Sequence, residues 1–411
     1  MKVVQVITSS KGGAGIAALR LHKALQQAGI QSAYLAMDKT LNFDDAEIED
    51  AFFTYQKPSL LKRALLKLQT TINPSYWQQY KKKLAAIDSE MDYEILTLPF
   101  SKYRLAAHPL IAEADLVNLH WVGQLLDYEH FFSEVKKPIV WTLHDMNPFM
   151  GIFHYKGDQE NNAVAKQIDD AVAAIKRQAI QNISKAAIVS PSNWLLTLAS
   201  NSGVFNRFQL KECIPNGIDL TQFNISKDTT LWDRLGIKDN ENVLLFASGS
   251  LDNHRKGMDL MLAALEELTI PVTLLTLGKG SVESSNKAVK IIPLGFVSEA
   301  AEIAACYKVS DAFVLPSRED NLPNTMLESM ATGTPVIGFA IGGMKEHISE
   351  GFNGILAEDI SAESLAKAIE EFFKNRHDYD QQKIRNYAQE NFSLQQQAEA
   401  YIEVYHKLLE H

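Results

Sequence analysis

The sequence predicts an α/β protein with two doubly wound parallel sheets, each in a domain of its own. Its 411 residues exceed what one domain usually holds and are enough for two. Short runs of apolar and β-branched residues alternate with segments of helical spacing, a pattern typical of parallel sheets covered by helices. The alternation begins again after a polar stretch at residues 214–240, which indicates a second unit.

The first half is expected to follow the order strand, helix, strand. A helix at residues 16–27 follows the first strand and ends at Gly29, because glycine commonly terminates helices. The strands are expected at residues 3–8, 32–37, 115–119, 138–143 and 186–190.

The second half repeats this pattern. Its strands are expected at residues 242–248, 271–277, 290–294, 312–315 and 335–339. Its helices are expected at residues 258–267, 300–309, 324–331, 361–374 and 393–409. We therefore divide the chain into a Rossmann-like amino-terminal domain (1–215), a Rossmann-like carboxyl-terminal domain (216–385) and a terminal helical segment (386–411), which is expected to return to the first domain.

The composition argues against several classes of protein. The formal net charge of −10 disfavours a nucleic-acid partner, because phosphate binding requires a basic face. Cys213 and Cys306 are too few and too far apart for a disulfide framework or a metal motif, and they fit a reducing compartment. Neither a signal-peptide pattern nor a run of about 20 apolar residues is present. We expect a cytoplasmic protein.

The strongest functional signal is the stretch VLPSREDNLPNTMLESMATGTPVIGFAIGGMKEHI at residues 314–348. In this stretch a polar loop follows a strand, and a helix begins near Asn324. A helix start offers backbone N–H groups and the positive end of a dipole, which suit a diphosphate or a sugar hydroxyl. Glu328, one turn further, can accept both hydroxyls of a ribose. The competing interpretation makes Asp320 a turn cap and Glu328 a solvated helix residue.

This stretch resembles the nucleotide-sugar signature of glycosyltransferase family four, the retaining enzymes of the GT-B fold. The signature runs Pro-Ser, an acidic residue, seven residues, Glu, then Ala-x-Gly-x-Pro-Val and Gly-Gly-x-x-Glu. The matching residues are Pro316, Ser317, Glu328, Gly333, Pro335, Val336, Gly342, Gly343 and Glu346. The resemblance spans nearly the whole chain and is densest between residues 243 and 346, and it implies two Rossmann-like domains that face a cleft.

The resemblance also implies roles for particular residues. Glu328 would bind the donor ribose. Asp320 stands where the family more often has Glu, at a position that contacts the donor sugar, so the change bears on the identity of the sugar. The Asp-Asn-Leu-Pro-Asn-Thr form resembles a subgroup that makes surface polysaccharides. The residues that would hold the diphosphate and sugar are Asn321, Leu322, Pro323, Asn324 and Thr325.

A second signal is the loop at residues 249–257, which follows a predicted strand and precedes a predicted helix. Arg255 and Lys256 stand beside the helix start, where their charges and the helix dipole favour a bound anion. The alternative is an exposed basic loop. The position and the family's Lys-Gly step favour donor binding, and Arg255 would supply the charge that the family often places at Ser250.

A third signal is the glycine-rich segment at residues 9–15. Gly13 and Gly15 fit a dinucleotide-binding fingerprint, with Asp38 ending the second strand. Taken alone, this pattern favours an oxidoreductase that uses NAD(P) or a flavin. In the GT-B interpretation, the same glycines contact the donor phosphate or the acceptor.

A fourth signal is a pair of histidines at strand ends. His120 and His144 each follow a predicted strand, and Asp145 comes directly after His144. A lone histidine is more often structural, but two at one sheet edge favour function. The resemblance places His144 near the transferred sugar, with Asp145 orienting it or contacting the acceptor. No metal-ligand spacing is present, and GT-B enzymes generally stabilise the leaving group without a metal.

Residues 57–83 carry seven basic residues, no acidic residue and an apolar stripe at helical spacing. Such a segment can lie on a membrane surface, at the inner face of the plasma membrane. It can equally pack on its own core with a solvated basic face.

The sequence therefore predicts a retaining glycosyltransferase, a hexosyltransferase of cell-surface polysaccharide synthesis. The donor is a nucleotide-diphosphate sugar with no further cofactor, and the acceptor is a saccharide or a lipid-linked saccharide. The residues expected to act in catalysis are His144, Asp145, Arg255, Lys256 and Asp320. Two alternatives remain: the oxidoreductase, and a GT-B protein that binds without catalysing.

Overall fold

The computed structural model describes residues 1–41, 76–226, 230–238 and 240–410. The chain divides by its internal contacts into two compact units. Unit 1 comprises Met1–Ser190, Leu195–Cys213 and Glu399–His411, and unit 2 comprises Pro191–Trp194 and Ile214–Ala398.

Unit 1 is built on a sheet that has seven strands in the described residues, in the order β3-β2-β1-β4-β5-β6-β7. Neighbouring strands are parallel except for β2 and β3. The strands are β1 (Lys2–Val6), β2 (Gln31–Leu35), β3 (Thr40–Leu41), β4 (Leu116–Leu119), β5 (Ile139–Thr142), β6 (Ala186–Ser190) and β7 (Leu210–Cys213). In this register Gln5 of β1 lies opposite Tyr34 of β2 on one side and Asn118 of β4 on the other.

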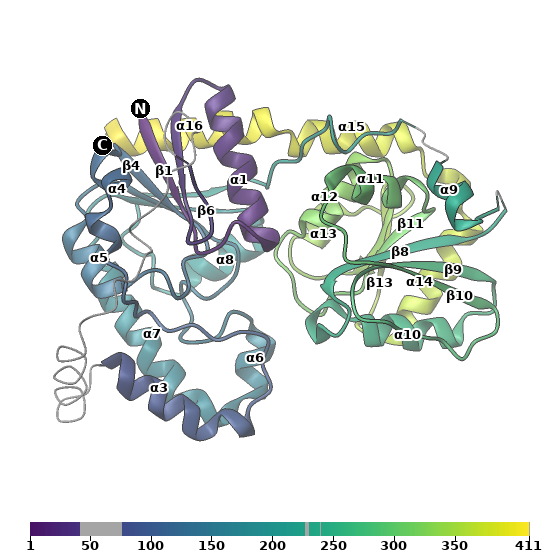
Figure 1. Ribbon diagram of the computed structural model, residues 1–411, viewed down its shortest axis with the longest axis horizontal. Coiled ribbons are helices and arrows are strands. Elements are labelled where there is room, and N and C mark those ends of the chain that lie inside the picture. The colour runs from purple at the N-terminus through teal and green to yellow at the C-terminus, as the bar shows by residue number, and fades with distance from the viewer. Residues whose placement is uncertain (42–75, 227–229, 239, 411) are drawn as a thin grey trace. The chain divides into compact units, whose positions relative to one another are not determined.

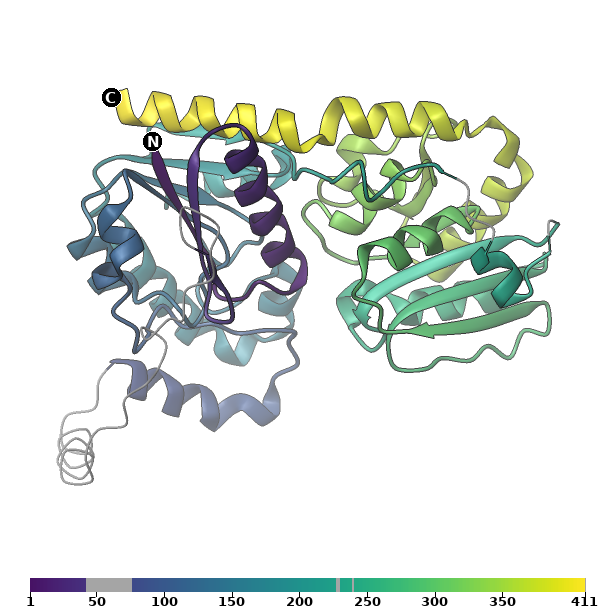
Figure 2. The same cartoon turned by 45° about the horizontal axis from the view of Figure 1, so that its top comes forward.

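Helices connect these strands and cover the sheet (Figure 1). They are α1 (Gly12–Gln27), α3 (Tyr76–Ile87), α4 (Pro109–Glu113), α5 (Tyr128–Glu134), α6 (Lys156–Asn161), α7 (Lys166–Ile180) and α8 (Asn193–Asn201). The last helix of the chain, α16 (Leu394–Glu410), has its residues from Glu399 onward in unit 1. Figure 2 shows this part of α16 running along unit 1. Its buried side chains are Tyr401, Val404, Tyr405 and Leu408.

Unit 2 holds a parallel sheet of six strands in the described residues, in the order β10-β9-β8-β11-β12-β13. This is the order of a doubly wound Rossmann sheet. The strands are β8 (Val243–Ser250), β9 (Val272–Lys279), β10 (Val289–Gly295), β11 (Ala312–Leu315), β12 (Val336–Phe339) and β13 (Gly354–Ala357). The helices are α9 (Thr230–Leu235), α10 (Met258–Glu267), α11 (Ala300–Lys308), α12 (Asn324–Ala331), α13 (Met344–His347), α14 (Ala362–Lys374) and α15 (Gln381–Phe392).

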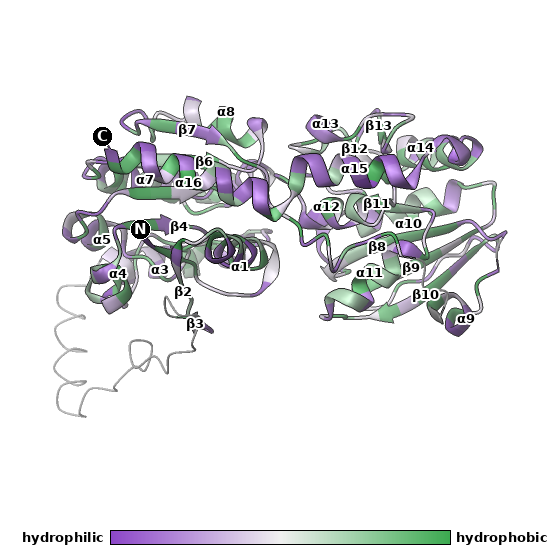
Figure 3. Ribbon diagram, turned by 90° about the horizontal axis from the view of Figure 1, so that it is seen from above, coloured by the Kyte–Doolittle hydropathy of each residue, from purple (hydrophilic) through white to green (hydrophobic). Residues whose placement is uncertain are grey.

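The two faces of the second sheet bury alternate side chains, as expected for a strand period of two. Val243 and Leu245 belong to a core shared with α11, α12 and α15. Leu244 and Phe246 belong to the core shared with α10 and α14. Figure 1 shows these two sets of helices on opposite sides of the strands, and Figure 3 shows that the outer helix α15 is mainly hydrophilic. The expected α/β class and doubly wound order are confirmed.

Three strands were not expected from the sequence, and all are short. They are β3, with two residues, and β7 and β13, with four each. The strand β7 is half-buried along its length and carries Lys211 and Glu212, so it lacks an apolar signal. None of the helices in the described part of the chain is both long and apolar enough to cross a bilayer.

Candidate functional site

The start of α12 in unit 2 is arranged to receive an anion. The preceding strand β11 is fully buried, and the loop after it brings the chain to Pro323, the N-cap residue of α12. No side chain caps this helix, and its first turn has no acidic residue. The positive end of the helix dipole is therefore not offset by a carboxylate of its own first turn. Asn321 and Leu322, just before the cap, are buried.

Glu328 is buried inside α12, with only 7% of its surface exposed. The hydroxyl of Tyr307, which is fully buried on α11, donates to Oε2 of Glu328 over 3.4 Å. A solvated helix residue would not be enclosed in this way, so that interpretation is wrong. Burying a carboxylate is costly unless hydrogen bonds or charges compensate it, and the two hydroxyls of a ribose are groups that can do so.

Asp320 joins the two loops that the sequence singled out. Its Oδ2 atom lies 2.5 Å from Nζ of Lys256 and 3.5 Å from Nη1 of Arg255. The same Nη1 donates to the carbonyl of Glu319 over 2.9 Å. Burial alone would raise the pKa of Asp320, but Lys256 and Arg255 outweigh it and lower the pKa. Two cations therefore meet at the carboxylate of Asp320, three residues before the N-cap of α12.

Two glycines allow the backbone segments around this site to approach one another. Gly257 has a φ of +76°, and a Cβ there would lie 1.9 Å from the carbonyl oxygen of Pro316. Gly342 has a φ of +48°, and a Cβ there would lie 1.8 Å from the carbonyl oxygen of Asp320. An L-side chain fits neither the conformation nor the space. Gly342 is one of the residues that match the family signature, and the structure shows why glycine is needed at this position.

Sequence reasoning missed three polar contacts of this site. Asn216 donates from Nδ2 to Oδ1 of Asn324 over 3.2 Å, and Ser192 donates to Oδ1 of Asn321 over 2.6 Å. Tyr307 contacts Glu328, as described above. Of the three, only Asn216 carried a signal, the Pro-Asn-Gly-Ile-Asp turn at residues 215–219. Ser192 lies 129 residues before its partner Asn321, and Tyr307 lies 21 residues before Glu328, on a separate helix. The fold brings both side chains to the motif.

Unit 1 carries a buried cluster of histidines beyond the ends of β4 and β5. The rings of His120 and His144 stack with their centroids 5.3 Å apart, and Nδ1 of His120 lies 3.0 Å from Nε2 of His144. Burial lowers the pKa of His144 to about 4, although Asp145 opposes the shift. Burial likewise holds the pKa of His120 well below its usual range, and His144 adds to this effect. Both imidazoles are therefore neutral at pH 7.

The structure corrects the expected pairing of Asp145 with His144. Oδ2 of Asp145 lies 2.6 Å from Nδ1 of His154 and accepts a hydrogen bond of 2.8 Å from the indole N–H of Trp121. The other ring nitrogen of His154 lies 2.9 Å from the hydroxyl of Thr97. Burial would raise the pKa of Asp145, but His154 and hydrogen bonds from the backbone of Asn147 and the indole of Trp121 lower it. Asp145 thus orients His154, and within the described residues its carboxylate makes no hydrogen bond to His144.

The glycine-rich segment also differs from expectation. Gly13 and Gly15 lie inside α1, which begins at Gly12, and not in a loop before it. Packing of α1 on the sheet outweighs the helix-destabilising effect of glycine, which is about 1 kcal/mol per residue. Asp38 accepts hydrogen bonds from the backbone and hydroxyl of Ser10 and from the hydroxyl of Ser9. In a dinucleotide-binding protein the carboxylate of Asp38 would bind the ribose. Here it is hydrogen-bonded to Ser9 and Ser10, which argues against the oxidoreductase.

Two further expected features are placed only in part. Ser250 is the last residue of β8 and pairs with Lys279 of β9. Of the basic stretch at residues 57–83, residues 57–75 lie outside the described residues. The remainder belongs to α3, where the ammonium of Lys81 lies 4.6 Å from the ring centre of Trp77.

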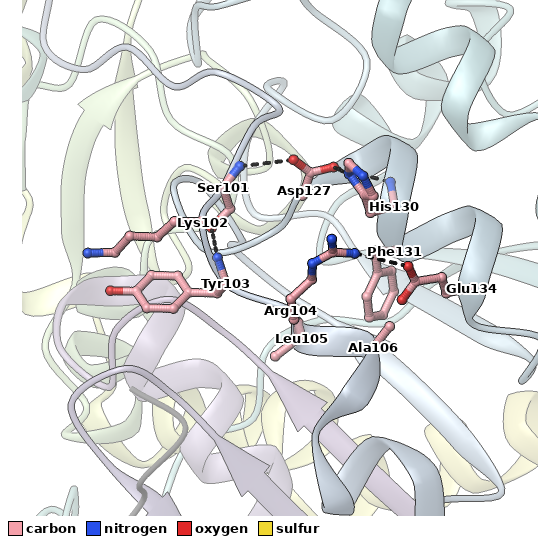
Figure 4. A pocket seen from close by; sticks show the side chains of 10 residues that line it. All are labelled: Ser101, Lys102, Tyr103, Arg104, Leu105, Ala106, Asp127, His130, Phe131 and Glu134. Atoms are coloured by element: carbon pink, nitrogen blue, oxygen red, sulfur yellow. Dashed lines mark hydrogen bonds and ion pairs between the residues drawn. The ribbon is translucent and has the colours of Figure 1, made fainter. Parts of the chain in front are cut away.

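A separate small pocket in unit 1 is structural (Figure 4). It lies between residues 101–106 and α5. Asp127 caps α5 by accepting from the backbone N–H of His130, and it also accepts from the backbone N–H of Ser101. Arg104 pairs with Glu134 over 3.3 Å. Because these charged groups are paired with one another, we infer that they stabilise the packing of residues 101–106 on α5.

Comparisons with known proteins find a family match within unit 2. Residues 241–375 match the family described as glycosyl transferases group 1. A glycogen synthase of Desulfitobacterium hafniense is 28% identical over 198 residues, which cover 43% of this chain and 42% of that protein. The chain spans less than half of the length of this relative and of others matched with similar strength.

Solved structures extend the likeness to the whole chain. Sucrose-phosphate synthase of Thermosynechococcus elongatus has a TM-score of 0.65 at 17% identity, over 99% of this chain and 98% of that one. Anabaena HepE, solved in complex with UDP-glucose, has a TM-score of 0.62 at 18% identity, over 99% and 100%. At such identities the likeness establishes the fold, which is that of GT-B glycosyltransferases. Residues 241–375, which lie in the second unit, are thus similar to the glycosyl transferases group 1.

Proposed function

We propose that the protein is a glycosyltransferase that moves a sugar from a nucleotide-diphosphate sugar to a hydroxyl of a saccharide or lipid-linked saccharide. We further propose that the anomeric configuration is retained and that the product is a cell-surface polysaccharide. One observation carries the proposal: Lys256 and Arg255 converge on Asp320 beside the uncapped start of α12, one turn before the buried Glu328.

The proposed roles follow from the charges. The diphosphate binds at the start of α12, where the helix dipole and the two cations favour negative charge. Glu328 accepts hydrogen bonds from the ribose. During transfer the bond between the anomeric carbon and the diphosphate oxygen breaks, and the acceptor oxygen forms a new bond to that carbon. The acceptor proton passes to the departing diphosphate, whose growing charge Lys256 and Arg255 stabilise.

The residues of unit 1 have proposed roles as well. His144, neutral and half-buried, contacts a hydroxyl of the transferred sugar. Asp145 acts through His154, whose ring it orients. Since Anabaena HepE binds UDP-glucose on the same fold, UDP-glucose is the first donor to test, followed by GDP- and ADP-sugars.

Isothermal titration of the full chain with these donors tests the proposal directly. We expect Lys256→Ala and Glu328→Ala each to weaken donor binding by about 10–100-fold, because each removes a charged or buried polar partner. Turnover should fall at least as much. Lys374→Ala is the matched control, since Lys374 is an exposed lysine that pairs only with Glu371 in the described residues. Unchanged donor affinity in both site variants would refute the proposal, and binding without turnover in the wild type would favour a non-catalytic protein.

A further inference from the structure

A line of hydrogen bonds crosses the core of unit 1 and ends at His144. Its first member is Tyr405 of α16, whose hydroxyl lies 3.5 Å from Nε2 of Gln5 on β1. The amide oxygen of Gln5 lies 2.9 Å from Nε2 of His120, and Nδ1 of His120 lies 3.0 Å from Nε2 of His144. Gln5, His120 and Tyr405 are at most 2% exposed, so water does not compete for these contacts.

The direction of every proton in this line follows from the Gln5 amide. Its oxygen faces His120 and can only accept, so Nε2 of His120 must carry the proton. A neutral imidazole has one N–H, and burial keeps His120 neutral by holding its pKa well below the usual range. Nδ1 of His120 therefore accepts, and Nε2 of His144 must donate to it.

His144 is left with an unprotonated Nδ1. Among the described residues, its side chain makes the one hydrogen bond to His120, and the ring remains partly exposed. Because burial lowers the pKa of His144 to about 4, this nitrogen is too weak a base to remove a proton at pH 7. It can accept a hydrogen bond from a hydroxyl and orient it.

We propose that Gln5 and His120 are positioning residues that fix the tautomer of His144, so that Nδ1 of His144 accepts a hydrogen bond from a hydroxyl of the transferred sugar. The hydroxyl partner rests on the proposed function. The tautomer is a property of the protein without ligand. Asp145 is the charged group that acts on His144, where it opposes the lowering of the pKa by burial, and its carboxylate is held by His154 and Trp121.

The direct test is a long-range proton–nitrogen NMR spectrum of the unliganded full chain labelled with ¹⁵N-histidine. We expect His144 to be protonated at Nε2 only. Gln5→Glu should reverse the line, because a carboxylate favours an imidazolium at His120, which then donates from Nδ1 and forces the proton of His144 onto Nδ1. Tyr401→Phe is the matched control, since Tyr401 lies on the same helix but contacts Thr142 and not Gln5.

Protonation of His144 at Nδ1, or at both nitrogens in exchange, in the wild type would overturn the proposal, whether or not the variant folds. An unchanged His144 spectrum in a folded Gln5→Glu protein would do so too. Given the proposed function, Gln5→Glu should lower turnover by about 3–10-fold, the worth of one neutral hydrogen bond, while donor affinity changes little. The expected tautomer in a wild type that transfers no sugar would refute the function and leave the positioning role intact.

Discussion

At the scale of single residues, the proposed donor site depends on Gly342, where a side chain would clash with the neighbouring backbone. In Gly342→Ala the added Cβ would lie 1.8 Å from the carbonyl of Asp320, at a φ of +48°. Gly351 has a comparable φ of +71° with open space around it. Comparing alanine at the two positions therefore separates the cost of the clash from the cost of the left-handed conformation.

We expect Gly351→Ala to lower the free energy of unfolding by about 1 kcal/mol, the cost of a left-handed L-residue, and to leave donor affinity unchanged. Gly342→Ala should cost roughly 2 kcal/mol more, since loops must shift to admit the Cβ. It should also weaken donor binding, because Asp320 and Asn321 move with the loop. Urea unfolding and calorimetric titration measure both quantities, and equal effects of the two substitutions would contradict this account.

At the scale of elements, helix α7 holds the loop after β5 through a buried lysine. Lys176 is 1% exposed, and its ammonium donates to the carbonyls of Asn147 and Gly151 and to Oδ1 of Asn147, over 2.6–2.9 Å. Asp169 of the same helix accepts from the backbone N–H of Ile152 over 2.6 Å. These hydrogen bonds from α7 therefore fix the conformation of the loop that carries Asp145 and His154.

Replacing this lysine should destabilise unit 1 in a pH-dependent manner. Lys176→Met leaves three buried oxygen atoms without a donor, which costs about 1–3 kcal/mol for each group left unsatisfied. Burial lowers the pKa of Lys176 to about 7 in the folded protein, against the ordinary lysine value of 10.5. Between these values the unfolded chain binds more protons, so the wild type gains stability relative to Lys176→Met as pH rises from 7 to 10.5. Urea unfolding of both proteins at pH 7, 8 and 9 measures this difference, and a constant difference would refute the pKa direction.

At the scale of the whole molecule, the carboxyl-terminal helix is part of the core of unit 1. The hydroxyl of Tyr401 contacts Thr142 of β5, and that of Tyr405 accepts from Asn118 of β4 over 3.0 Å. The burial of these two rings is nearly complete. The first and last segments of the chain therefore meet in one unit.

Deletion of residues 399–411 should unfold unit 1 selectively. The truncation exposes apolar surface worth about 1.5–3 kcal/mol for each fully buried side chain and leaves Gln5, Asn118 and Thr142 without their phenol partners. Calorimetry of both chains should show that the truncated chain loses the unfolding enthalpy contributed by unit 1. Donor binding to unit 2 should persist. Survival of the full transition enthalpy in the truncated protein would contradict this expectation.

The sequence by itself determined the class of the fold and the parts of unit 2 that lie within one motif. Alternating apolar runs and helical spacing predicted the α/β class and most strands, because both are local patterns set by burial. Residues 314–348 hold Asp320, Glu328 and Gly342 in one continuous stretch. Their relation could be predicted because the strand, loop and helix that carry them are adjacent in the chain.

Only the tertiary structure decided contacts between segments distant in sequence. The resemblance had Asp145 orient His144 or contact the acceptor, yet the side chain of His144 contacts His120. His120 in turn contacts Gln5, which lies 115 residues earlier in the sequence. Short strands such as β7 were missed because their pairing comes from a neighbouring strand and not from their own apolar pattern. The order of the strands in the sheet and the packing of α16 on unit 1 bring such residues together. The periodicity of the sequence does not predict these contacts, because it reflects only local burial.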